Sequence, residues 1–90
     1  MSVQRIAVVG AGTMGNGIAH VFALHGYDVT LIDLDASLLR EAQDTIEENL
    51  SRQVDKDAIS TDEKAAALDR LALTPDTAEG VEATDLVVEA

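Results

Sequence analysis

Six residues near the start of the chain have the types and spacing of a phosphate-binding turn: Gly10, Ala11, Gly12, Thr13, Met14 and Gly15. They follow the apolar run 5–9 and lead into a helical pattern, and Asp33 comes eighteen residues after Gly15, at the end of a second apolar run. The first turn of a helix offers free backbone N–H groups to an anion. An acidic residue after the next strand accepts hydrogen bonds from ribose hydroxyls. Together, these residues predict a dinucleotide-binding βαβ unit.

Each glycine of this motif, and Asp33 after it, has a physical role in the expected site. Gly10 permits a tight turn out of the strand, Gly12 lets the backbone approach a pyrophosphate, and Gly15 lets the helix pack closely on the strands. A 2′-phosphate on the ribose would meet the carboxylate of Asp33, so the sequence favours NAD over NADP. The alternative is that the glycines make only a strand–helix turn and Asp33 begins a polar loop, which leaves their joint spacing unexplained.

The elements that position these residues can be read from the hydrophobic pattern. Strands are expected at about 4–9, 29–32, 71–74 and 85–89, and helices at about 13–25, 36–54 and 61–70, with a short crossover at 76–82. Gly26 is placed to end the first helix, and Ser60 with Glu63 forms a capping box for the third. This order predicts an α/β fold: a Rossmann-type parallel sheet of order 3-2-1-4, with helices on both faces and a helical hairpin inserted between strands 2 and 3.

Composition limits what else the chain can do. Its 90 residues carry 17 acidic and 6 basic side chains, a net charge of −11, which argues against nucleic acids and anionic membranes as partners. The absence of cysteine excludes disulfides and thiolate chemistry. The N-terminus has no signal-peptide pattern and no apolar run is long enough to cross a membrane, so we expect a cytoplasmic protein. The acidic side chains either form an ordinary solvated surface or are an adaptation to a cytoplasm of high salt concentration, where screening relieves their mutual repulsion.

The last expected strand, at about 85–89, lies at the end of the given sequence. An apolar parallel strand is normally paired with a strand on each side and covered on both faces. The sequence ends within this strand, so no later segment is present to pair with it or cover it. We therefore expect residues 1–90 to be a truncated part of an NAD-binding domain. As a free chain it is expected to self-associate through the exposed fourth strand.

Beyond the glycine motif, the chain resembles the start of 3-hydroxyacyl-CoA (3-hydroxybutyryl-CoA) dehydrogenases over its whole length, about the first third of such an enzyme. The resembling runs are 6–19, 26–29 with Asp33, 46–52 and 83–90. The resemblance implies an NAD-dependent oxidoreductase of fatty acid β-oxidation that interconverts L-3-hydroxyacyl-CoA and 3-oxoacyl-CoA. It implies that Gly10–Gly15 hold the pyrophosphate, Asp33 the adenosine ribose and Ala90 the nicotinamide half, and that Asn49 and Lys56 contact coenzyme A of the acyl-CoA substrate.

The resemblance implies that a C-terminal catalytic and dimerisation portion is absent, because the family's catalytic histidine–glutamate pair would lie beyond Ala90. It therefore implies no catalytic residue within this chain and no turnover by it alone. His20 and His25 are interpreted as structural or solvated. One alternative is a stand-alone, non-catalytic NAD-binding or structural module. Another is a different oxidoreductase, but FAD enzymes usually carry Glu in place of Asp33. The 3-hydroxyisobutyrate and 6-phosphogluconate dehydrogenases share the Gly-x-Gly-x-Met-Gly form but generally use Asn-Arg for NADP.

Overall fold

Four parallel strands form one sheet in the order β3-β2-β1-β4, as the sequence predicts. The computed structural model describes residues 3–82 and 84–90; the N-terminal Met1-Ser2 and Ala83 of the run 83–90 lie outside these. Val8 of the central strand is opposite Leu31 on one side and Val88 on the other. The strands are β1 (Arg5–Val9), β2 (Asp28–Ile32), β3 (Leu71–Thr74) and β4 (Leu86–Glu89).

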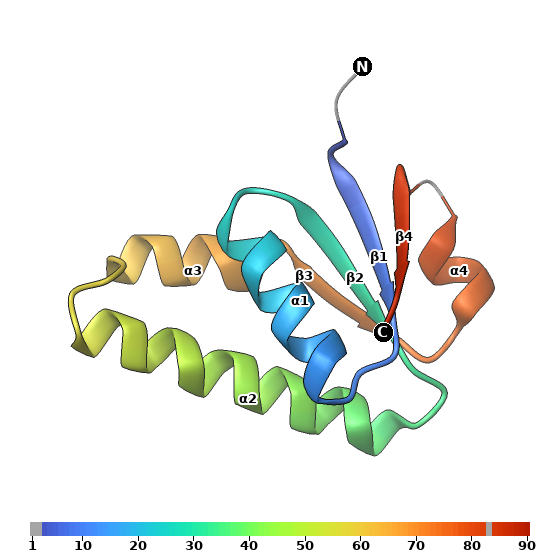
Figure 1. Cartoon of the computed structure of the whole chain (residues 1–90), viewed down its shortest axis with the longest axis horizontal. Helices are drawn as coiled ribbons and strands as arrows, with labels where there is room; N and C mark the ends of the chain where they lie inside the picture. Colours follow the sequence, from blue (N-terminus) through green and yellow to red (C-terminus); the bar gives the residue numbers. More distant parts are fainter. Residues whose placement is uncertain (1–2, 83) are drawn as a thin grey trace.

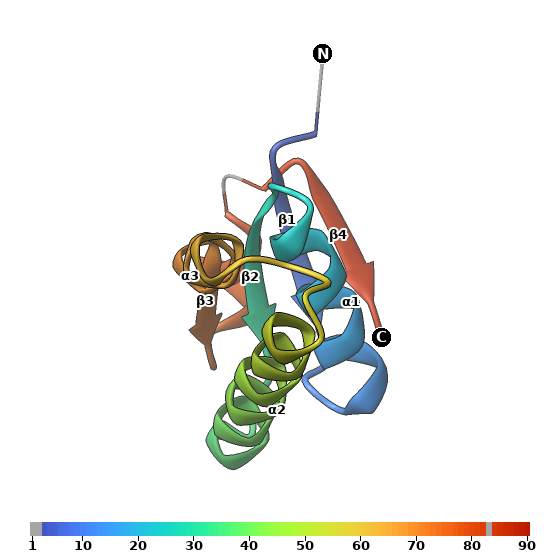
Figure 2. The same ribbon diagram turned by 90° about the vertical axis from the view of Figure 1, so that its left-hand side faces the viewer.

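Helices cover both faces of this sheet (Figure 1). Figures 1 and 2 show α1 and α2 side by side, with α3 returning antiparallel to α2 to complete the predicted hairpin. On the opposite face, Gly80 of α4 lies against the side chain of Ile32. The fold class and the hairpin are therefore confirmed. The helices are α1 (Thr13–Leu24), α2 (Ala36–Asp55), α3 (Thr61–Asp69) and α4 (Thr77–Val81).

The core is almost entirely aliphatic. Strand residues that point toward α1, α2 and α3 pack against small and branched side chains of those helices, and the two aromatic rings, Phe22 and Tyr27, meet edge to face with centroids 5.5 Å apart. This packing positions the carboxyl ends of the strands, where the glycine motif begins. The buried core residues on this face are Ile6, Val8, Ala11, Ala19, Ala23, Val29, Leu31, Leu39, Ala42, Ile46, Leu50 and Ala67.

Capping side chains set the ends of the helices. Ser60 and Glu63 form the predicted reciprocal capping box at the start of α3. Gly26 follows the last turn of α1 with a φ of +98°, a conformation that favours glycine. Asp35 caps α2, and the hydrogen bond from the Ser37 hydroxyl, together with those from the Ser37 and Leu38 N–H groups, lowers its pKa.

Asp85 ties the start of β4 to β1. Its Oδ2 accepts hydrogen bonds from the N–H groups of Gln4 at 2.9 Å and Arg5 at 3.0 Å, and these bonds lower the pKa of the carboxyl group below its ordinary value of 3.8. Its own N–H donates to the carbonyl of Arg5. No local sequence pattern marks this link, because Asp85 and its partners are about 80 residues apart along the chain.

Acid should destabilise the protein through these two aspartates. A group whose pKa is lower in the folded state contributes stability above its unfolded pKa, and this contribution is lost as the pH falls through the folded pKa. We expect the free energy of unfolding in urea to fall between about pH 5 and about pH 3. The free energy of unfolding should fall less in the Asp85→Asn variant than in wild type. In the Asp44→Asn variant, which changes an exposed residue of α2, it should fall as much as in wild type. Equal falls in all three proteins would contradict the role of Asp85.

A second prediction compares two glycines within helices. A Cβ at Gly80 would collide with the Ile32 side chain and lie 3.0 Å from Thr74 Cγ2, whereas a Cβ at Gly17 has no neighbour within 4 Å. Gly80→Ala should therefore destabilise the protein by about 1–3 kcal/mol through overpacking. Gly17→Ala should stabilise it by up to about 1 kcal/mol through helix propensity. Thermal unfolding followed by circular dichroism measures both, and a stable Gly80→Ala protein would contradict the packing of α4.

Candidate functional site

The glycine motif turns the chain from β1 into α1 at the carboxyl edge of the sheet. Gly10 has a φ of +107°, and its N–H donates to the carbonyl of Ile32 at 2.8 Å. A Cβ at Gly10 would lie 2.9 Å from the carbonyl oxygen of Ala90, and one at Gly15 would collide with the carbonyl of Gly10. The steric roles expected of Gly10 and Gly15, a tight turn and close helix packing, are therefore confirmed.

Gly12 faces open space instead. No other heavy atom of the described structure lies within 4 Å of its ideal Cβ position. Gly12 is also the N-cap of α1, and within the described residues it provides no side-chain cap and the first turn contains no acidic side chain. The positive end of the α1 dipole and the N–H groups of its first turn, around Thr13 and Met14, are thus left open to an anion. This arrangement suits a phosphate that approaches the backbone closely.

Asp33 lies beside this turn. Its Oδ2 accepts a hydrogen bond from the N–H of Ala11 at 2.9 Å, and its Oδ1 accepts one from the N–H of Asp35 at 2.9 Å. The half-buried carboxylate thus joins the glycine turn to the start of α2. A carboxylate has about four acceptor directions, so each oxygen can accept a further hydrogen bond from a ligand. The structure therefore brings Asp33 and the glycine motif together, as the sequence predicts.

A cavity of about 240 Å³ opens next to Asp33. Leu34 and Thr77 line it together with the carboxyl ends of β1 and β2, and Leu34 is 84% exposed. An apolar side chain this exposed suits the face of a flat ring. Neither residue is among those that the sequence predicts for the site. An apolar residue between Asp33 and Asp35 is a signal that could have indicated Leu34, but Thr77 comes from a distant part of the chain and no sequence signal marks it.

Ala90 completes this edge of the sheet. Its N–H donates to the carbonyl of Val9 at 2.9 Å, and its side chain lies near the space that a Cβ would need at Gly10 or Gly15. The structure thus gathers Gly10, Gly12, Gly15, Asp33 and Ala90 at the carboxyl ends of β1, β2 and β4. In parallel sheets, ligands bind at this edge.

Asn49 and Lys56 lie elsewhere, on α2. Their spacing of seven residues puts them on the same side of the helix, about two turns apart. Asn49 is half-buried and its Oδ1 accepts a hydrogen bond from Arg52 at 3.0 Å, while Lys56 is exposed at the C-cap. The structure therefore places these two residues with each other and not with the glycine turn.

The two histidines contact other parts of the protein. His20 Nε2 lies 2.8 Å from Oε1 of Gln53, and His25 Nδ1 lies 2.7 Å from the carbonyl oxygen of Val21. These contacts agree with the structural interpretation of both residues. Over residues 3–82 and 84–90, no three histidine and carboxylate side chains form a group that could hold a metal ion.

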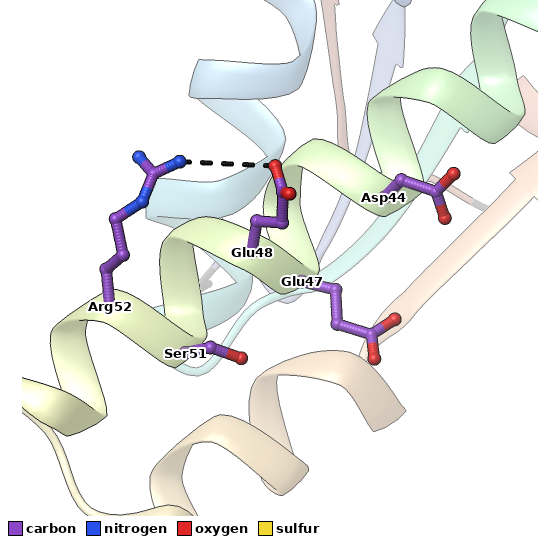
Figure 3. Close-up of a pocket in the computed structure, with 5 residues that line it drawn as sticks. All are labelled: Asp44, Glu47, Glu48, Ser51 and Arg52. Atoms are coloured by element: carbon purple, nitrogen blue, oxygen red, sulfur yellow. Dashed lines mark ion pairs between the residues drawn. The ribbon is translucent and has the colours of Figure 1, made fainter.

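Another cavity, of about 580 Å³, lies along α2 (Figure 3). Asp44, Glu47 and Glu48 line it with Ser51 and Arg52. The exposed Arg52–Glu48 ion pair, at 4.0 Å, balances one of the three carboxylates. Because the remaining negative charge repels phosphate, this cavity does not suit the ligand expected at the glycine turn. None of the described helices is both long and apolar enough to span a bilayer.

Comparison with known proteins agrees with the geometry. The family model described as "3-hydroxyacyl-CoA dehydrogenase, NAD binding domain" matches residues 5–90. Over 87 residues the chain is 42% identical to a 3-hydroxybutyryl-CoA dehydrogenase of Bradyrhizobium diazoefficiens, covering 97% of this chain and 29% of the relative. It is 39% identical over 94 residues to the human mitochondrial hydroxyacyl-coenzyme A dehydrogenase, covering 98% of this chain and 30% of the relative.

Solved structures show the same relationship. The crystal structure of a 3-hydroxybutyryl-CoA dehydrogenase from Escherichia coli superposes with a TM-score of 0.94 at 39% identity, covering 99% of this chain and 19% of that one. One from Ralstonia eutropha superposes with a TM-score of 0.94 at 35% identity, covering 99% and 31%. The chain thus spans less than a third of the length of these relatives.

Proposed function

We propose a function from the premise that this chain belongs to the family of NAD-binding domains of 3-hydroxyacyl-CoA dehydrogenases. It is the part of an L-3-hydroxyacyl-CoA dehydrogenase that holds NAD(H). In the overall reaction the C3–H bond of the hydroxyacyl group breaks, its hydride reduces NAD⁺ to NADH, the hydroxyl proton is released and a 3-oxoacyl-CoA remains. When bound, the nicotinamide supplies the hydride acceptor, and this chain supplies binding and orientation.

The observation that carries this proposal is the open space at Gly12. It adjoins the N-terminus of α1, which has no side-chain cap at Gly12, and the Asp33 carboxylate hydrogen-bonded to Ala11. The N–H groups of the turn from Gly10 to Gly15 would hold the pyrophosphate, and the helix dipole would contribute about 0.3–2 kcal/mol. Asp33 accepts hydrogen bonds from the ribose hydroxyls and disfavours a 2′-phosphate.

Two further parts of the ligand fit the same edge. Leu34 and Thr77 would hold the adenine ring, because the cavity that they line adjoins Asp33 and offers an apolar surface. Ala90, which follows β4 on the other side of β1 from β2 and Asp33, would contact the nicotinamide half. The coenzyme A of the substrate reaches α2 at Asn49 and Lys56, whose amide and ammonium groups can donate to phosphate.

We propose that the chain alone binds NAD(H) without turnover. Hydride transfer needs a base for the hydroxyl proton within hydrogen-bonding reach of a held substrate. His20 and His25 are engaged with Gln53 and the carbonyl of Val21, and neither is among the residues gathered at the carboxyl edge. We propose the cytoplasm as the compartment of this protein; the rat and human relatives are named as mitochondrial enzymes.

Substitution of Gly12 tests the phosphate site. In Gly12→Val the side chain would occupy the space that we assign to the pyrophosphate, so NADH affinity should fall at least about tenfold, equivalent to 1.4 kcal/mol. The fold should persist, because a Cβ at Gly12 has no neighbouring atom within 4 Å. NADH fluorescence titration measures the affinity and far-UV circular dichroism the fold, with Gly17→Ala as the control. Unchanged NADH binding would place the phosphate elsewhere, and tighter binding of NADPH than NADH would contradict the role of Asp33.

We also propose that free chains self-associate through β4. This strand is at the end of the sheet, paired with β1, and its Leu86 and Val87 are 43% and 47% exposed. An unpaired edge with apolar side chains is a template for pairing with another chain.

Sedimentation velocity at increasing concentration tests this proposal. It should show dimers or larger species, more of them at about 0.5 M salt, because salt screens the repulsion between chains of net charge −11. Val87→Lys should remain monomeric, since a charged side chain on an edge opposes strand pairing. Val3→Lys changes an exposed valine outside the strand and should behave as wild type. A monomeric wild-type chain would contradict the proposal.

A further inference from the structure

A separate cavity, of about 200 Å³, adjoins the glycine turn between the start of α1 and the first half of α2. The residues that α2 contributes to it are spaced by three, four and seven positions, so they lie on one face of that helix. The cavity therefore connects the turn with one side of α2. Its lining residues are Ala11, Gly12, Thr13 and Asn16, followed by Leu38, Glu41, Ala42 and Thr45.

Glu41 is the charged residue among those that line this cavity. Its side chain is exposed, and over residues 3–82 and 84–90 no basic side chain lies within ion-pair distance of it. The neighbouring Arg40 leaves α2 about 100° away around the helix axis, because each residue of an α-helix turns the chain by that angle. No cation of the described structure therefore neutralises the carboxylate beside the turn.

This negative charge opposes the attraction that the turn offers to an anion. The first turn of α1 contains no acidic side chain of its own, and Gly12 leaves its N–H groups open. The end of the helix is equivalent to about half a positive charge, whereas Glu41 carries a full negative charge. Each additional negative charge on a ligand at the turn is therefore attracted less than the helix end alone would attract it.

We propose that Glu41 is a specificity residue, which lets the turn accept the pyrophosphate of a dinucleotide and disfavours nucleotides that end in a phosphate there. This inference rests on the proposed function, in which the turn holds the pyrophosphate of NAD. Both phosphates of NAD are diesters with one negative charge each, whereas the terminal phosphate of ADP carries about 1.5–2 negative charges at neutral pH. ADP otherwise has the same adenine, ribose and first phosphate, so Glu41 distinguishes the two by charge.

Isothermal titration with ADP-ribose and ADP tests this role, because the second phosphate is a diester in ADP-ribose and a terminal group in ADP. The titrations are done without divalent cations and at about 0.01 M ionic strength, where the Debye length is about 30 Å. In Glu41→Gln, the affinity for ADP should rise about twofold more than the affinity for ADP-ribose, the size of one charge–charge term in water at about 8 Å. Glu41→Lys should double this effect on the free-energy scale, to about fourfold.

The matched control is Glu47→Gln. It removes the same charge from another exposed position of α2, whose side chain extends toward α3 (Figure 3). The ratio of the ADP and ADP-ribose affinities should therefore stay at its wild-type value. Circular dichroism should show that all variants are folded. Equal gains for ADP and ADP-ribose in Glu41→Gln would overturn the specificity role.

Salt provides a readout that a purely structural role of Glu41 would not change. At about 1 M KCl the Debye length is about 3 Å, so the repulsion between Glu41 and a bound phosphate is screened. Wild type and Glu41→Gln should then show the same ratio of ADP to ADP-ribose affinity. A difference that persists at this salt concentration would overturn the electrostatic mechanism.

The remaining outcomes distinguish this inference from the proposed function. If the wild-type chain binds NADH, Gly12→Val weakens that binding and Glu41→Gln matches Glu47→Gln, the role of Glu41 is wrong and the dinucleotide site stands. If the wild-type chain binds none of NADH, ADP-ribose and ADP at millimolar concentration, the proposed function fails, and the role of Glu41 fails with it.

Discussion

The close approach of α1 to the end of β1 is the constraint on which the rest of the structure depends. A side-chain carbon at Gly15 would collide with the carbonyl of Gly10, so the helix can begin here only without one. This contact brings the N-terminus of α1 to the carboxyl edge of the sheet. The open space at Gly12 and the position of Ala90 both follow from it, because each belongs to the same turn or packs against it.

Asp33 connects this turn to the helical hairpin. One carboxylate oxygen accepts from Ala11 in the turn and the other from Asp35, the residue that caps α2. The residue proposed to bind the ribose therefore also determines how α2 starts relative to the turn. A side chain held by two hydrogen bonds has little freedom to reorient, and this preorganisation lowers the entropy lost when a ligand binds.

The charge balance explains how an acidic protein can hold anionic ligands. At the glycine turn the positive potential comes from backbone N–H groups and the helix dipole, so no lysine or arginine is needed there. On α2, three cavity-lining carboxylates, Asp44, Glu47 and Glu48, create a region that repels phosphate. Arg52 and Lys56 lie on the side of the helix that carries Asn49. Arg52 also lines this cavity, where its exposed ion pair with Glu48 balances one of the three carboxylates.

The sequence alone was sufficient for the order and type of the elements, because hydrophobic periods, the Ser60–Glu63 capping box and Gly26 act over a few residues, and parallel strands with right-handed crossovers permit few topologies. It also identified Gly10, Gly15 and Asp33, whose conformations or spacing are local properties. Only the tertiary structure decided which distant groups meet: Asp85 with the N–H of Arg5, Thr77 with Leu34, and Gly80 with Ile32. The hydrogen bond from Arg52 to Asn49 also could not be predicted from the sequence, although the two residues are three apart, because it depends on side-chain rotamers. Packing between segments far apart in the chain, and the choice among rotamers, leave no periodic signal in a single sequence.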